Sequence, residues 1–75
     1  MLKQELQALF DTMPKIVQEK LQPVMDNLLE RAGDLDADGP NAPGYDEEYE
    51  LIRKEVNKVK YLNDQWQIMN AKKNN

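Results

Sequence analysis

The sequence contains no cysteine, no histidine and no serine, and Thr12 is its one threonine. It therefore lacks a thiol or serine nucleophile, and it lacks a side chain whose ordinary pKa lies near neutrality for general acid–base chemistry. Disulfide bonds and a zinc site built from cysteine or histidine are excluded for the same reason. The sequence also has no glycine-rich phosphate-binding loop. The composition predicts that the protein is not an enzyme.

Long apolar runs are missing as well. No window approaches the roughly 20 apolar residues that a membrane span requires. Residues 1–10 mix polar with apolar side chains, whereas a signal peptide has a continuous apolar run. Small secreted domains usually depend on disulfides, so the absence of cysteine favours a reducing compartment. We expect a cytoplasmic protein, a single domain of 75 residues, that does not associate with membranes.

Charge is distributed unevenly along the chain. Residues 1–33 hold four basic and five acidic groups, a net charge of −1. Residues 34–50 hold seven acidic groups and no basic ones, a net charge of −7, and residues 51–75 hold six basic and two acidic groups, a net charge of +4. The acidic middle disfavours a general attraction to nucleic acid, whereas the basic C-terminal third offers a local site for a phosphate or an acidic partner.

The spacing of apolar residues predicts three helices, over about residues 2–12, 14–32 and 45–71. No segment alternates apolar and polar residues as a half-buried strand does, so the predicted fold class is all-α. Residues 33–44 hold all three glycines and two of the four prolines, which predicts an acidic loop. Residues 72–75 are expected to form a disordered tail.

Prolines and glycines locate the ends of the second helix. Asp11 or Thr12 is expected to cap it, with Pro14 in its first turn, where the missing amide hydrogen costs little. Gly33 is the expected C-terminal cap. Pro23 lies in the interior and predicts a kink of more than about 20° or a local break.

A helical hairpin of this size, without disulfides or a structural metal, has a marginal core. The third predicted helix carries Tyr61 and Ile68 about 160° around from Ile52 and Val56, which gives it two apolar faces. Either the short N-terminal helix of the same chain covers the second face, or another copy does. We predict a homo-oligomer, in which helical hairpins form an antiparallel four-helix bundle or a higher ring. The expected interface comprises Leu2, Leu6, Leu9, Phe10, Met13, Ile52, Val56, Val59, Leu62, Trp66 and Met69.

One short motif, Asp34-x-Asp36-x-Asp38-Gly39, resembles the first half of an EF-hand calcium loop. In that family, carboxylates at alternate positions converge on one cation and the glycine makes a sharp turn. The resemblance implies a calcium site at Asp34, Asp36 and Asp38. The second half departs from the pattern, because the twelfth position is Tyr45 where the family has a bidentate Glu. This departure favours the alternative, an acidic solvated turn.

Basic residues on the third predicted helix suggest a further alternative, binding of nucleic acid or a nucleotide. Arg53 and Lys60 share one face of this helix, and Lys54 and Lys58 share another. At the level of architecture, a dimer of helical hairpins resembles the small ROP-type bundles, and such bundles can present basic helix faces to RNA. The competing interpretation is a solvated face on which nearby glutamates pair with the lysines.

A small anionic ligand at a subunit junction is a third possible partner. The third helix offers aromatic and amide side chains for such a site: Tyr45, Tyr49, Trp66, Asn57, Asn63 and Asn70. Asn63 falls within the apolar stripe, where a buried amide often sets register and oligomer number. Together these observations predict a non-enzymatic regulator, inhibitor or sequestering protein, a class that includes proteins of viruses and mobile elements. It would act by occupying the surface of a macromolecular partner or a ligand.

Overall fold

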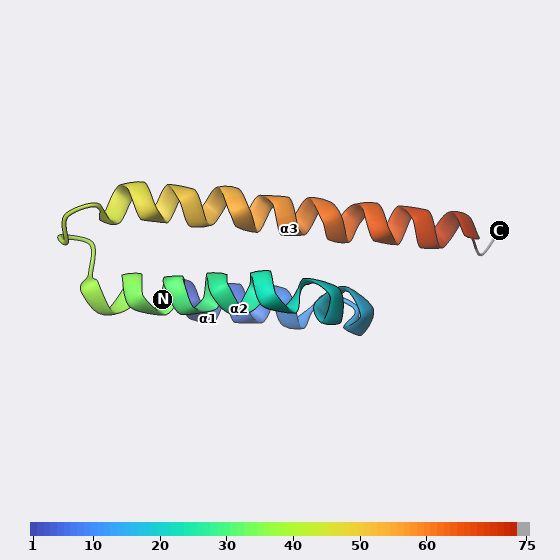
Figure 1. Ribbon diagram of the computed structural model, residues 1–75, viewed down its shortest axis with the longest axis horizontal. Helices are drawn as coiled ribbons and strands as arrows, with labels where there is room; N and C mark the ends of the chain where they lie inside the picture. Colours follow the sequence, from blue (N-terminus) through green and yellow to red (C-terminus); the bar gives the residue numbers. More distant parts are fainter. Residues whose placement is uncertain (74–75) are drawn as a thin grey trace.

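The computed structural model describes residues 1–73 and consists of three helices: α1 (Leu2–Asp11), α2 (Lys15–Asp38) and α3 (Tyr45–Lys73). No strand occurs among the described residues, so the prediction of an all-α fold is confirmed. In Figure 1, α2 and α3 run antiparallel and are joined at one end by a loop, while α1 lies along α2. The molecule is a rod of 51 × 17 × 17 Å.

All three helices contribute to one apolar core. α2 is the central element, because it packs against both α1 and α3. Leu28, Ile52 and Val59 have the largest fully buried side chains. The other buried apolar residues are Leu2, Leu6, Phe10, Met13, Val17, Met25, Ala32, Leu35 and Val56. A single copy of the chain therefore shelters the stripe on α3 that runs from Ile52 to Val59.

The second helix does not end at Gly33 as the sequence suggested. α2 continues to Asp38, and the loop is confined to residues 39–44 instead of 33–44. The reason lies in tertiary packing, because Leu35 keeps the apolar spacing of Leu28 and Ala32 and is buried in the core. Gly33 lies where α1 passes closely: a Cβ added there would be 3.2 Å from the side chain of Lys3. The two glycines that do adopt positive φ are Gly39 and Gly44, one at each end of the loop.

Asp36 connects the last turns of α2 to the first turn of α1. Its Oδ1 accepts a hydrogen bond from the amide of Leu2 at 3.1 Å, and its Oδ2 accepts one from Lys3 at 3.0 Å. The N-cap residue of α1 is Met1, whose side chain carries no oxygen for this purpose. The Asp36 carboxylate of α2 thus accepts hydrogen bonds from backbone amides in the first turn of α1, which have no partner within α1. It also places a negative charge at the N-terminus of α1, the positive end of that helix's dipole.

The turn between α1 and α2 also differs from the expectation. Pro14 is itself the N-cap of α2, with φ −57° and ψ 147°, rather than a residue of its first turn. The Thr12 hydroxyl does not cap α2 but donates to the carbonyl of Leu9 at 2.6 Å, at the end of α1. Gln18 ties the turn to α2, because its side-chain amide donates to the carbonyl of Met13 at 2.8 Å. α2 runs through Pro23 without a break.

α3 is the longest helix and extends beyond the other two at its C-terminal end (Figure 1). Of the tail expected over residues 72–75, Lys72 and Lys73 belong to α3, and residues 74 and 75 lie outside the described residues. None of the helices in the described part of the chain combines the length and the apolar content needed to cross a membrane.

Candidate functional site

Exposed apolar side chains gather on one side of the α2–α3 pair. On α3, Leu51, Leu62 and Met69 fall within about 20° of one another around the helix axis. On α2, Ile16 and Val24 lie within about 60° of Arg31, whose side chain reaches across to α3. These five residues, which are between 39% and 64% exposed, are called the apolar flank below.

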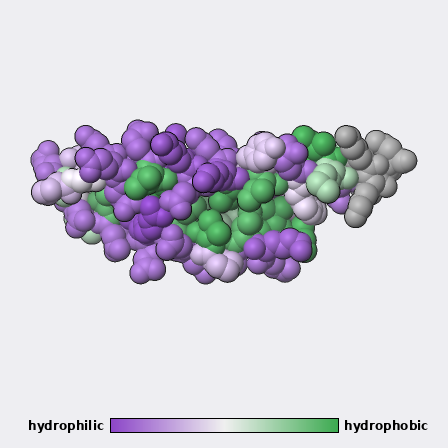
Figure 2. Space-filling model, turned by 45° about the horizontal axis from the view of Figure 1, so that its top comes forward, coloured by the Kyte–Doolittle hydropathy of each residue, from purple (hydrophilic) through white to green (hydrophobic). Residues whose placement is uncertain are grey.

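The apolar flank is concentrated toward the end of the molecule that lies away from the loop. Figure 2 shows hydrophobic side chains gathered in the half of the surface toward the C-terminal end of α3, whereas hydrophilic ones cover the loop end. Tyr61 and Ile68 add exposed apolar surface farther around α3, at 61% and 50% exposure. α1 does not cover these two residues, so the alternative in which the N-terminal helix shelters them is wrong. Contiguous exposed apolar surface of this kind marks sites of protein association.

Arg31 lies beside the loop-side part of the apolar flank, level with Leu51. Its guanidinium donates to Glu48 at 2.5 Å and to Glu55 at 2.6 Å, and so it ties α2 to two positions of α3 that are about two turns apart. The hydrogen bonds that Arg31 donates, first to Glu48 and then to Glu55, raise the pKa of Arg31 above its ordinary value. Because the pKa is higher in the folded state, the ion pairs of Arg31 stabilise the fold fully at any pH below the ordinary pKa of arginine. This stabilisation is lost only as pH rises through the higher folded-state pKa. Arg31 therefore remains charged throughout the neutral range.

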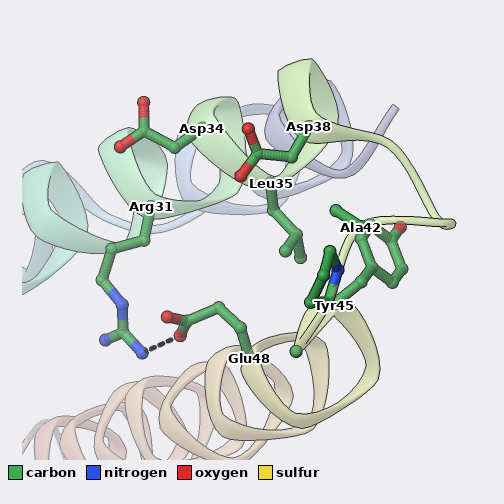
Figure 3. Close-up of a pocket in the computed structure, with 9 residues that line it drawn as sticks. Arg31, Asp34, Leu35, Asp38, Ala42, Tyr45 and Glu48 are labelled. Carbon is green, nitrogen blue, oxygen red and sulfur yellow. Dashed lines mark hydrogen bonds and ion pairs between the residues drawn. The ribbon is translucent and has the colours of Figure 1, made fainter.

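A cavity of about 260 Å³ lies at the loop end, between the last turns of α2 and the first turn of α3. Figure 3 shows Leu35 pointing from α2 into the gap between the helices. In this view Tyr45 and Ala42 lie to its right, and the Arg31–Glu48 ion pair lies to its left. Asp34 and Asp38 line the same cavity from one side of α2. Its polar lining is therefore mostly acidic.

The three residues of the proposed calcium loop lie on a helix and do not converge. Asp34 and Asp38, four residues apart, share one side of α2, whereas Asp36 faces α1 and binds its amides. Among the described residues, no group of three or more acidic side chains is close enough together to hold a metal ion. The loop geometry on which the EF-hand resemblance depends is absent here, because Leu35 holds this segment in α2.

The structure separates the eleven predicted interface residues into three groups. Leu62 and Met69 are exposed on the apolar flank, while Leu9 and Trp66 are partly buried against the core. The remaining seven belong to the buried core of the single chain: Leu2, Leu6, Phe10, Met13, Ile52, Val56 and Val59. They are therefore not available to a partner unless the fold opens.

The basic residues of α3 do not form one patch. Arg53 and Lys60 lie on one side of the helix, and Lys54 and Lys58 lie on another, as the spacing predicted. All four are exposed. The Arg53 guanidinium carbon lies 6.0 Å from the centre of the Tyr49 ring, within the range of a cation–π contact. A phosphate contact on either side would thus involve only two basic side chains of α3 among the described ones.

The residues proposed for a small anionic ligand are also spread out. Tyr45 and Tyr49 stack on each other near the loop, with ring centres 6.1 Å apart, and both pack partly against the core. Asn57 and Asn70 are exposed on different sides of α3. Asn63 is partly buried, and its side-chain oxygen accepts a hydrogen bond from Gln67 at 3.3 Å.

Sequence reasoning missed several residues that shape this surface. Arg31, Leu51, Ile16 and Val24 are all absent from the interface predicted from the sequence. Their angular positions carried a signal, because Ile16 lies about 120° around α2 from Leu28, too far to share its burial. Comparisons with models of protein families, with curated protein sequences and with solved structures find no match for the chain.

Proposed function

We propose that the protein is a non-catalytic, self-associating binding protein and that a second copy of the chain covers its apolar flank. The observation that carries this proposal is the exposure of Leu62 and Met69, at 50% and 64%, on the same side of α3 as the exposed Leu51. A domain this small gains stability when such surface is buried by association. In this proposal the protein acts by occupying surfaces, as a regulator or a sequestering protein does.

The contribution of one side chain sets the size of the expected effect. Burying a leucine fully contributes about 1.5–3 kcal/mol, and Leu62 is already half buried in the single chain. Two copies of Leu62 in a dimer would then contribute about 2 kcal/mol, and burying a carboxylate in their place adds a further penalty. Leu62→Glu should raise the dissociation constant by about 100-fold or more, since each 1.4 kcal/mol is a factor of ten.

Light scattering after gel filtration, over a range of protein concentrations, tests the proposal. The unaltered chain should show at least twice the 8.8 kDa mass of one copy, and Leu62→Glu should return it to one copy. The control substitution must lie outside the apolar flank, which excludes Ile16→Glu. Gln67→Glu adds the same charge to another side of α3 and should leave the mass unchanged. A chain that remains at 8.8 kDa at high concentration would contradict the proposal.

A further inference from the structure

The distribution of charge along the rod restricts how two copies can pair on the apolar flank. The loop end carries the acidic segment 34–50, with net charge −7. Arg53, Lys54, Lys58 and Lys60 lie along the first half and middle of α3, whereas residues 15–22 of α2 and 61–73 of α3, at the opposite end, together hold four basic and two acidic residues, a net charge of +2. A two-fold axis parallel to the helices would place the two acidic loop ends side by side. An axis perpendicular to the helices would instead place each acidic end beside the weakly basic end of the other copy.

The positions of the apolar residues on α3 give the register of the second arrangement. In an antiparallel pair of α3 helices, the residue numbers of facing side chains have a constant sum. Leu51 is isolated near the acidic end and Met69 lies near the other end, so matching these two gives a sum of 120 and an axis near residue 60. Leu62 then lies close to the axis, about 6 Å along the helices from its own copy in the partner, and the residue that faces it is Lys58.

The surface of α3 has recesses in matching places. A shallow groove lined by Glu47, Glu50 and Leu51 lies near the acidic end, where this register brings the partner's Met69. A second shallow groove, lined by Lys58, Tyr61 and Leu62, lies near the axis. Lys54 lines both grooves, so the apolar side chains of Leu51, Tyr61 and Leu62 lie there beside charged groups.

We infer that two copies pair through the apolar flank with their loop ends pointing in opposite directions and α3 antiparallel to α3, in a four-helix arrangement centred near residue 60. This inference rests on the proposed self-association and adds the orientation and register of the two copies. The acidic loop ends, with their cavities, then lie at the two far ends of the assembly. Neither cavity is covered by the partner.

Distances between spin labels test the orientation directly, because the chain has no cysteine and a single introduced one labels a single position. Asp46 and Asn57 are both exposed, lie within about 20° of each other on α3 and are about 120–160° around the helix from Leu51, Leu62 and Met69. Each also lines one of the two grooves. With an axis near residue 60 and a rise of 1.5 Å per residue, labels at Asp46→Cys should be separated by about 42 Å along the helices. Labels at Asn57→Cys should be separated by only about 9 Å along the same direction.

The two labels distinguish the possible outcomes. Dimeric protein with a long distance at position 46 and a short one at position 57 supports the inference. Dimeric protein with short distances at both positions means that the loop ends lie together, which overturns the inference and leaves self-association standing. Monomeric mass without dipolar coupling at either position overturns both proposals.

Salt provides a second readout that needs no label. Opposite charges face each other in the inferred arrangement, so raising the ionic strength should weaken the dimer by screening their attraction. With the loop ends together, like charges are adjacent and added salt should strengthen the dimer. A dissociation constant that falls as salt rises would therefore contradict the inferred orientation.

Discussion

Replacing Asp36 with alanine tests whether a carboxylate on α2 holds α1 in place. The substitution removes both acceptors of the hydrogen bonds from the amides of Leu2 and Lys3, at 3.1 and 3.0 Å. Loss of a helix cap costs about 0.5–2 kcal/mol, and loss of a negative charge beside a helix N-terminus costs about 0.3–1 kcal/mol more. Alanine returns up to about 0.7 kcal/mol through its higher helix propensity. We expect a net loss of about 1–2 kcal/mol.

Asp34→Ala is the matched control, because Asp34 is an exposed aspartate on the same helix, two residues away. It has the same gain in helix propensity and the same change in charge near the C-terminus of α2, but it does not contact α1. The difference between the two variants therefore isolates the capping contact. A difference of about 2 kcal/mol corresponds to about 8–16 °C in Tm for a domain of this size.

Thermal unfolding followed by circular dichroism measures this difference, with both variants at one protein concentration because association makes Tm depend on concentration. Asp36→Asn keeps one side-chain acceptor without the charge and should fall between the alanine variant and the unaltered chain. Equal Tm values for Asp36→Ala and Asp34→Ala would refute the capping argument.

Three further predictions follow from individual contacts. Gly33→Ala should stabilise the fold by up to about 1 kcal/mol in urea unfolding, because alanine favours the helix and the flexible Lys3 side chain can move away from the added methyl group. A loss of stability would instead show that α1 packs too closely on α2 to admit the methyl group. Arg31→Lys should cost about 1 kcal/mol, since lysine cannot bind two carboxylates with a planar fork, and this loss should be similar at about pH 6 and pH 9 because the arginine does not titrate there. Millimolar calcium should leave Trp66 fluorescence unchanged, because Asp36 is turned toward α1; a saturating response would contradict this arrangement.

The parts of the fold that local patterns determine were predictable from the sequence. The regular spacing from Tyr45 to Trp66 indicates a long helix because one stripe of α3 packs on α2 over this length. The end of α2 was not predictable in the same way, because glycine and alternate aspartates favour a loop locally. Burial of Leu35 and the contact of Asp36 with α1 hold these residues in the helix instead. The amides that Asp36 binds are 34 and 33 positions away, which a local pattern does not contain.

The candidate interface illustrates a different limit. Helical spacing places Val56 and Leu62 in one broad apolar seam, yet Val56 is 3% exposed and Leu62 is 50% exposed. The two residues lie about 120° apart around α3, so Val56 faces the core while Leu62 lies on the side of the helix that carries the exposed Leu51. Trp66, farther along α3, still packs against the core, so the exposure of Leu62 follows from its angular position. Periodicity shows that a face is apolar but does not show which element covers it.

Arg31 contributes both to the α2–α3 hairpin and to the apolar flank, the two features on which the proposed assembly depends. Its pairing with Glu48 and Glu55 offsets one of their two negative charges beside the loop-side part of the apolar flank. Without a cation at this position, the carboxylates of α3 would lie unpaired beside the surface that the second copy is proposed to cover, and unpaired charge at an interface opposes association. The ion pairs therefore support the hairpin and the proposed interface together. Since the guanidinium remains charged in the neutral range, this support does not depend on pH there.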